Sequence, residues 1–188
     1  MKKLFLIFGL ISVLLFGGAD LSNMSPGETI QLTFFSLGKL LKEKPNVTNT
    51  EIRSLLEPVF DMSEISKRSL GSYWTRFNEE QQKEFIKSFS NLLFKSYITK
   101  IRKANTSNIE IVDEIGNEER AIVQTKISQR SDSYLIEYKM QKKDRLWKIY
   151  DLVIEHIGLT SNYRNEFGGM IRKMGVEEFL KTIKEKSV

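Results

Sequence analysis

The feature that most constrains the fold is a change in the period of the apolar residues near Asn108. Before it, apolar residues recur at helical spacing, and after it they alternate at every second position, as in β-strands. Short polar connections, which join antiparallel neighbours, separate four strand-like runs, NIEIVDEI, ERAIVQTKI, SYLIEYKMQ and RLWKIYDLVIEHI. We therefore predict a four-stranded antiparallel meander.

Helices are predicted on both sides of this meander. Ser25-Pro26-Gly27-Glu28 combines an N-cap hydroxyl, a first-turn proline and a glutamate three residues after the cap, which is typical of a helix start. The expected helices follow Ser25, Asn49 or Thr50, Asp61, Asn78 and Ser161, and the last is interrupted at Gly175 before a final helix over 176–186. Helices, then a meander, then helices predict one α+β domain over residues 20–188.

The fourth strand-like run leaves a question open, because it is apolar on both faces. Simple alternation divides its side chains between two faces, with Trp147, Ile149 and Val153 on one and Tyr150, Leu152 and Ile154 on the other. One face would pack against helices as core. The other needs a cover that the sequence does not name.

The first residues, MKKLFLIFGLISVLLFGGAD, have the features of a cleaved signal peptide over residues 1–19. They place two lysines before an apolar run too short to span a membrane, followed by small residues. The chain has no cysteine, so we expect neither disulfides nor a lipoprotein anchor. Removing the segment leaves 27 basic and 24 acidic residues, a balance too mild to predict a nucleic-acid partner.

Reactive groups are scarce, which favours binding over catalysis. His156 is the only histidine, so the common zinc sites and a Cys–His pair are excluded. No phosphate-binding glycine motif occurs. Asp151 and Glu155 could form a carboxylate pair, but two acids at this spacing are usually solvated or salt-bridged. We expect no enzyme, no metal and no cofactor.

Several segments together resemble the MlaC family, the toluene-tolerance or ABC-transporter auxiliary proteins. The resemblance covers nearly the whole mature chain and rests on FDMSEISKRSLGSYWTRFNEEQQKEFIKSFSNLLFKSYITKI, residues 60–101, on WKIYDLVIEHIGLTSNYRNEF, residues 147–167, and on GVEEFLKTIKEK near the end. It includes Trp74, Trp147 and the Asn162-Tyr163-Arg164 motif. The chain departs from the family pattern at His156, where members commonly carry Gly.

The resemblance implies a twisted antiparallel sheet packed against helices, with an apolar pocket between them that takes phospholipid as cargo. It also implies a monomeric carrier in the periplasm that maintains outer-membrane lipid asymmetry. Its partners would be an outer-membrane lipoprotein complex and an inner-membrane ABC transporter with a ring-forming substrate-binding protein.

Candidate lipid contacts combine apolar residues of the long helix and the strands with two residues of the family motif. They are Phe89, Leu93, Tyr97, Ile136, Tyr138, Tyr150, Leu152, Ile154, Tyr163 and Arg164. Each apolar one could equally be plain core, since periodicity does not separate a pocket wall from a core. Arg164 could meet a lipid phosphate through charge-assisted bonds, or hold its helix to a carboxylate such as Asp151.

Two other functions stay open on the sequence alone. A secreted hydrolase or isomerase on a cone-shaped α+β fold could use His156, Asp151 and Glu155. An exported scaffold could instead bind another protein through its apolar face.

Overall fold

The computed structural model describes residues 21–103, 109–129 and 132–188, so the predicted signal peptide lies outside the described residues. Its helical elements alternate short 3₁₀ turns with longer α-helices. They are η1 (Leu21–Asn23), α2 (Pro26–Glu43), α3 (Asn49–Leu56), η2 (Glu57–Val59), α4 (Met62–Leu70), η3 (Gly71–Arg76), α5 (Glu79–Lys103) and α6 (Leu159–Ser187).

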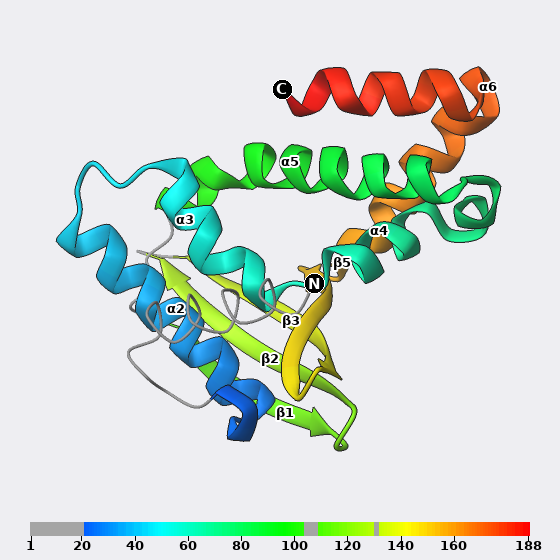
Figure 1. Ribbon diagram of the computed structural model, residues 1–188. Coiled ribbons are helices and arrows are strands. Elements are labelled where there is room, and N and C mark those ends of the chain that lie inside the picture. Colours follow the sequence, from blue (N-terminus) through cyan, green and yellow to red (C-terminus); the bar gives the residue numbers. More distant parts are fainter. Residues whose placement is uncertain (1–20, 104–108, 130–131) are drawn as a thin grey trace, which may run out of the picture.

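The strands form one antiparallel sheet in chain order. They are β1 (Ile109–Gly116), β2 (Arg120–Gln129), β3 (Asp132–Lys143), β4 (Leu146–Ile154) and the two-residue β5 (Ile157–Gly158). Figure 1 shows α2 lying across one face of the sheet, and α5 crossing beyond the end of the sheet that lies opposite the β3–β4 turn. The second half of α6 runs alongside α5. The predicted α+β class and the meander are confirmed.

Most helix ends follow the predicted capping chemistry, but the predicted cap of α3 at Asn49 or Thr50 is wrong, because Thr48 is its N-cap. Ser25 and Thr48 each form a capping box with the glutamate three residues later, and Asp61 caps α4 through the Glu64 amide. Gly71 ends α4 with a φ of 57°. Helix α6 consists of two helical segments joined by a kink at Gly175, the predicted position, where φ is 81° and ψ is 173°.

A β-bulge at Tyr150 answers the question of the two apolar faces, and simple alternation along β4 is wrong. Lys139 pairs with Asp151 but Met140 pairs with Ile149, so β4 holds one extra residue, Tyr150. Because paired residues share a face, Trp147 and Ile149 lie on the same side as Leu152 and Ile154. Trp147, Ile149, Leu152 and Ile154 therefore all face α2, on what we call the inner face, whereas Val153, paired with Glu137, lies on the outer face.

A second bulge, at Val112 of β1, has a similar effect at the edge of the sheet. Ile111 pairs with Thr125 and Asp113 with Gln124, which leaves Val112 unpaired. Beyond the bulge Glu114 turns to the inner face, where its Oε2 accepts a hydrogen bond of 2.9 Å from the Gly27 amide at the start of α2. The carboxylate thus meets the positive end of the helix.

Three buried clusters hold these layers together. The helical core joins α4, α5 and α6 around Phe85, Phe89, Phe167 and Phe179. The sheet core lies between α2 and the inner face, and the α3 core joins α2, α3 and the end of α5. Phe60, only half-buried, packs against all three clusters, so they meet at this side chain.

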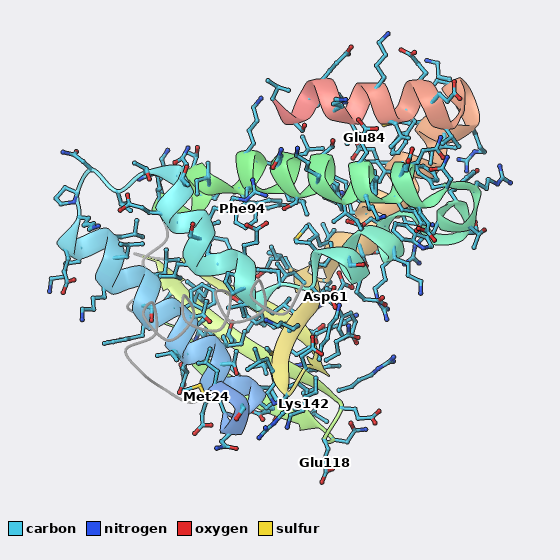
Figure 2. All side chains as sticks on the ribbon, viewed as in Figure 1. Met24, Asp61, Glu84, Phe94, Glu118 and Lys142 are labelled. Atoms are coloured by element: carbon cyan, nitrogen blue, oxygen red, sulfur yellow. The ribbon has the colours of Figure 1, made fainter. Side chains whose placement is uncertain are left out.

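Asp61 connects the helical half of the protein to the sheet (Figure 2). Its amide donates to the Ile149 carbonyl at 2.8 Å. Its buried carboxylate accepts hydrogen bonds from the Glu64 amide at 3.0 Å, Lys143 Nζ at 2.8 Å and Gln141 Nε2 at 3.2 Å. One side chain thereby caps α4 and binds β3.

The predicted fourth strand is too long at its end. β4 stops at Ile154, and Glu155 and His156 form a two-residue turn into β5 with φ values of 47° and 68°. Positive φ at both central residues is the geometry of a type I′ hairpin, which favours glycine. His156 is therefore an exposed turn residue, although the predicted fourth strand-like run included it.

Replacing Asp61 with Asn should lower the free energy of unfolding by about 1–2 kcal/mol near neutral pH, because Lys143 loses its carboxylate partner. Burial raises the pKa of Asp61, but its hydrogen bonds outweigh this and hold the pKa below the ordinary 3.8. The carboxylate's contribution is present above that value and is lost as pH falls through the lowered folded pKa.

Urea unfolding at about pH 7 and about pH 3 measures this change. The difference between wild type and variant should narrow in acid, whereas exposed Glu79→Gln should match wild type at both pH values. A difference that is the same at both values would contradict the assigned titration.

Replacing His156 with Gly should raise the free energy of unfolding by about 0.5–1 kcal/mol, since glycine takes the left-handed conformation without a Cβ clash. Lys142→Gly, in extended β3, should lower it instead. Thermal or urea unfolding of the two variants gives the comparison. A loss of stability in His156→Gly would show that the side chain makes a contact worth more than the backbone strain.

Candidate functional site

The inner face of the sheet is buried at one end and open at the other. Near the β3–β4 turn, the paired residues Ala121, Met140 and Ile149 are all at most 4% exposed, and Val123 and Tyr138 follow at 0% and 3%. Here α2 covers the sheet. Toward the opposite end of the sheet the side chains are less buried, because the apolar side chains of the inner face extend beyond the part that α2 covers.

This open end carries two rows of apolar side chains, which we call the open strip. One row crosses from β1 to β5 around buried Thr125, and the second crosses β1, β2 and β3. Apart from Thr125, their residues are half-buried or exposed, up to 64% at Ile157. The open strip comprises Ile109, Ile111, Ile127, Tyr134, Ile136, Ile154 and Ile157.

Helix α5 supplies aromatic side chains beyond this end of the sheet. Phe94 lies on the side of α5 that is turned toward the sheet in Figure 2. Tyr97, on the next turn, and Tyr163 of α6 are half-buried at the edge of the helical core. Burial, with smaller contributions from Tyr97 and Glu166, raises the pKa of Tyr163 to about 12, and burial also raises the pKa of Tyr97. Both phenols are therefore neutral at physiological pH.

The predicted lipid contacts differ in how deeply they are buried. Phe89 and Leu93 are buried in the helical core, where Phe89 packs 4.9 Å from the Tyr163 ring. Ile136, Leu152 and Ile154 lie half-buried on the inner face of the sheet. Tyr138 shares that face but is buried against Phe34 of α2. Their roles as lipid contacts stay predictions, and half-burial favours the sheet group together with Tyr97 and Tyr163.

Tyr150 and Arg164 lie apart from the open strip. Tyr150, the bulge residue, has the Arg68 guanidinium 4.4 Å from its ring centroid. Arg164 Nε donates a 2.8 Å hydrogen bond to the Arg68 carbonyl at the end of α4. Asp151, the partner we considered for Arg164, instead accepts from the Thr160 amide at 3.0 Å. Arg164 thus joins α6 to α4.

The residues considered for catalysis do not form a common site. Glu155 Oε1 accepts from the Leu135 amide at 3.0 Å, and Asp151 Oδ2 lies 3.8 Å from Lys139 Nζ. Over residues 21–103, 109–129 and 132–188, no three acidic or imidazole side chains gather to hold a metal ion. In the same part of the chain, no helix is long and apolar enough to cross a membrane.

Five members of the open strip were not among the predicted contacts. Ile109, Ile111, Ile127, Tyr134 and Ile157 lie on β1, β2, β5 and the start of β3. Once the strand pairing is known, the sequence shows that each of them lies on the inner face of its strand. The pairing cannot be read from the sequence, since the bulges at Val112 and Tyr150 shift it.

Comparison with known proteins identifies the family. The profile described as "MlaC protein" matches residues 33–185. The chain belongs to the MlaC family. The resemblance drawn from the sequence motifs is thereby confirmed. So is the expectation that the chain is not an enzyme, because the family's proteins are non-enzymatic lipid carriers.

One relative and one solved structure illustrate the similarity. The chain is 25% identical over 146 residues, 74% of this chain and 68% of the relative, to the Haemophilus influenzae intermembrane phospholipid transport system binding protein MlaC. It also resembles a phospholipid-binding protein from Ralstonia solanacearum, solved in complex with a phospholipid, with a TM-score of 0.73 and 20% identity. That match covers 85% of this chain and 94% of the other, and it supports the fold.

If the open strip is held apart from the core, its side chains should contribute little to stability. Tyr134 and Tyr138 share strand and face but differ in exposure, at 41% and 3%. We expect Tyr138→Ser to cost about 3 kcal/mol and Tyr134→Ser less than about 1 kcal/mol, measured by urea unfolding. Equal losses would place Tyr134 in the core.

Proposed function

We propose that this protein is a phospholipid carrier whose open strip, together with half-buried aromatics of α5 and α6, covers the acyl chains. The observation that carries the proposal is the uncovered apolar end of the inner sheet face. Large contiguous patches of exposed apolar side chains are uncommon on soluble proteins, and such patches mark binding surfaces. The membership in the MlaC family and the similarity to a phospholipid-binding fold support the same ligand class.

The physical task of such a carrier is to lower the cost of exposing hydrocarbon to water. Each methylene moved into water costs about 0.8 kcal/mol, so two acyl chains represent on the order of 20 kcal/mol. Isoleucine and aromatic side chains can offset this without directed hydrogen bonds. This matches a surface built from six isoleucines and one tyrosine.

The proposal places the protein in the periplasm, after removal of residues 1–19. It would accept and deliver lipid at an outer-membrane lipoprotein complex and at an inner-membrane ABC transporter with its ring-forming binding protein. The name of the Haemophilus influenzae relative, a binding protein of an intermembrane phospholipid transport system, supports these partners. We propose that it works as a monomer and takes energy from its partner, because no nucleotide-binding motif occurs in the chain.

Purified protein should carry phospholipid, detected by organic extraction and mass spectrometry. Replacing Ile154 and Ile157 with Asp should reduce the bound lipid about tenfold, because two charges would lie against the acyl chains. The matched control is Ile115→Asp with Ile122→Asp. These two residues also form a cross-strand isoleucine pair, with Ile115 61% exposed against 64% for Ile157, but on the outer face.

Equal lipid in both double variants would show that the open strip is not the acyl site. No lipid in wild type, and no loading of the delipidated protein, would contradict the carrier function itself. Leu93→Asp is a poorer probe, since buried Leu93 belongs to the helical core and its replacement would unfold the protein.

A further inference from the structure

The open strip ends sharply along β3, where the inner face passes from open to closed. Tyr134, Ile136 and Tyr138 lie on this face at alternate positions of the strand, about 7 Å apart. Tyr134 is 41% exposed and Ile136 is half-buried, whereas Tyr138 is only 3% exposed. Met140, the next inner residue, is fully buried. The open surface on β3 therefore stops within one step of the strand, between Ile136 and Tyr138.

Phe34 of α2 supplies the cover at this step. Its ring meets the Tyr138 ring edge-on, with the ring centroids 5.9 Å apart and an angle of 69° between the ring planes. Phe34 is itself half-buried, and it packs against both the sheet core and the α3 core. One part of this side chain thus closes over Tyr138, while another part stays accessible at the boundary of the covered region.

The residues around Tyr138 form a packed wall over β2 and β3. Val123, its cross-strand partner on β2, and Thr125, the next inner residue of β2, are both 0% exposed. Burial raises the pKa of Tyr138, and a hydrogen bond with Thr125 lowers it to a smaller extent, so the phenol stays neutral. Leu152, the partner on β4, is half-buried. Because packed interiors do not admit extra methylenes without displacement of side chains, a chain lying along β3 stops at this wall.

We infer that the Phe34–Tyr138 pair forms the closed end of the acyl site and sets the chain length that the carrier covers. The inference rests on the proposed function and adds a preference for acyl length to it. A methylene that fits between the open end and this pair leaves water, whereas a methylene beyond that length stays in water at one end or the other. Each methylene left in water lowers the affinity about fourfold, which corresponds to about 0.8 kcal/mol.

Delipidated protein mixed with micelles that contain equal amounts of dimyristoyl-, dipalmitoyl- and distearoyl-phosphatidylethanolamine provides the test, with the bound lipids measured by mass spectrometry. The micelle covers every methylene, so the bound fractions report the methylenes that the protein leaves in water. Wild type should bind less of the distearoyl than of the dimyristoyl lipid. Phe34→Ala removes the ring above Tyr138 and should raise the ratio of distearoyl to dimyristoyl lipid about fourfold for each methylene that gains cover.

Phe35→Ala is the matched control, because Phe35 is the next residue of α2 but is 68% exposed. This variant should leave the ratio unchanged. Ile136→Phe tests the opposite direction, since a larger side chain just before Tyr138 shortens the open strip and should lower the ratio below that of wild type. Ile136 is half-buried and lies outside the packed wall, so this variant keeps the inference testable if Phe34→Ala does not fold.

Equal binding of the three lipids by wild type overturns the inference and leaves the carrier function intact. The same conclusion follows if folded Phe34→Ala keeps the wild-type ratio, if Phe35→Ala changes the ratio equally, or if Ile136→Phe does not lower it. Urea unfolding establishes that each variant is folded. Absence of bound lipid in wild type contradicts the carrier function and, with it, the inference.

Discussion

The arrangement of this protein depends on keeping most apolar side chains of β4 on one face of a five-stranded sheet. Strict alternation would divide β4 between two faces and require a second cover. The bulge at Tyr150 removes that requirement, because it brings Ile149 and Leu152 to the same side. Tyr150 itself then turns to α4 and stacks with Arg68. A single extra residue thus both brings Ile149 and Leu152 to the inner face and adds a contact between the sheet and α4.

Once the inner face holds most of the apolar residues of β4, the length of its cover decides how much apolar surface stays open. Helix α2 buries the end of the face near the β3–β4 turn, and Phe34 closes over Tyr138. Helix α5 packs mainly against α4 and α6, through Phe85 and Phe89, and stays beyond the far end of the sheet (Figure 1). The strands therefore extend past their cover. An apolar surface is thereby left at this end of the sheet.

Much of the fold can be predicted from sequence because its signals are local. Ser25 and Glu28, Asp61 and Glu64, and Gly175 each set a helix boundary within a few residues. The strand order follows from short polar connections. The faces of β1 and β4 could not be predicted, since a bulge is a property of the pairing of two strands and leaves no mark in either one.

The site was less predictable for a related reason. Ile136 and Ile154 were candidates, yet Phe89 and Leu93 carry the same apolar signal and lie in the core. Whether an apolar side chain is core or open surface depends on which element packs over it, α4 and α6 for Phe89 and Leu93 and α2 for the inner face of the sheet. The role of Arg164, a residue of the family motif, could not be predicted either. Its partner is the backbone carbonyl of Arg68, and a backbone carbonyl is present whatever the residue type.

An open apolar strip also bears on how cargo is held and released. In water the strip stabilises the empty carrier less than a fully buried surface would, because its isoleucines are only half-buried or, at Ile157, exposed. Under the proposed function, acyl chains that cover it would bind only the folded chain and would stabilise it by an amount that grows with the logarithm of their affinity. The free energy that favours burial of the acyl chains would also oppose their release into water. Release therefore requires a partner whose apolar surface buries the chains as well as the strip does. Since the strip lies at an edge of the sheet near Ile157, a partner could approach the tails there without first unfolding the core.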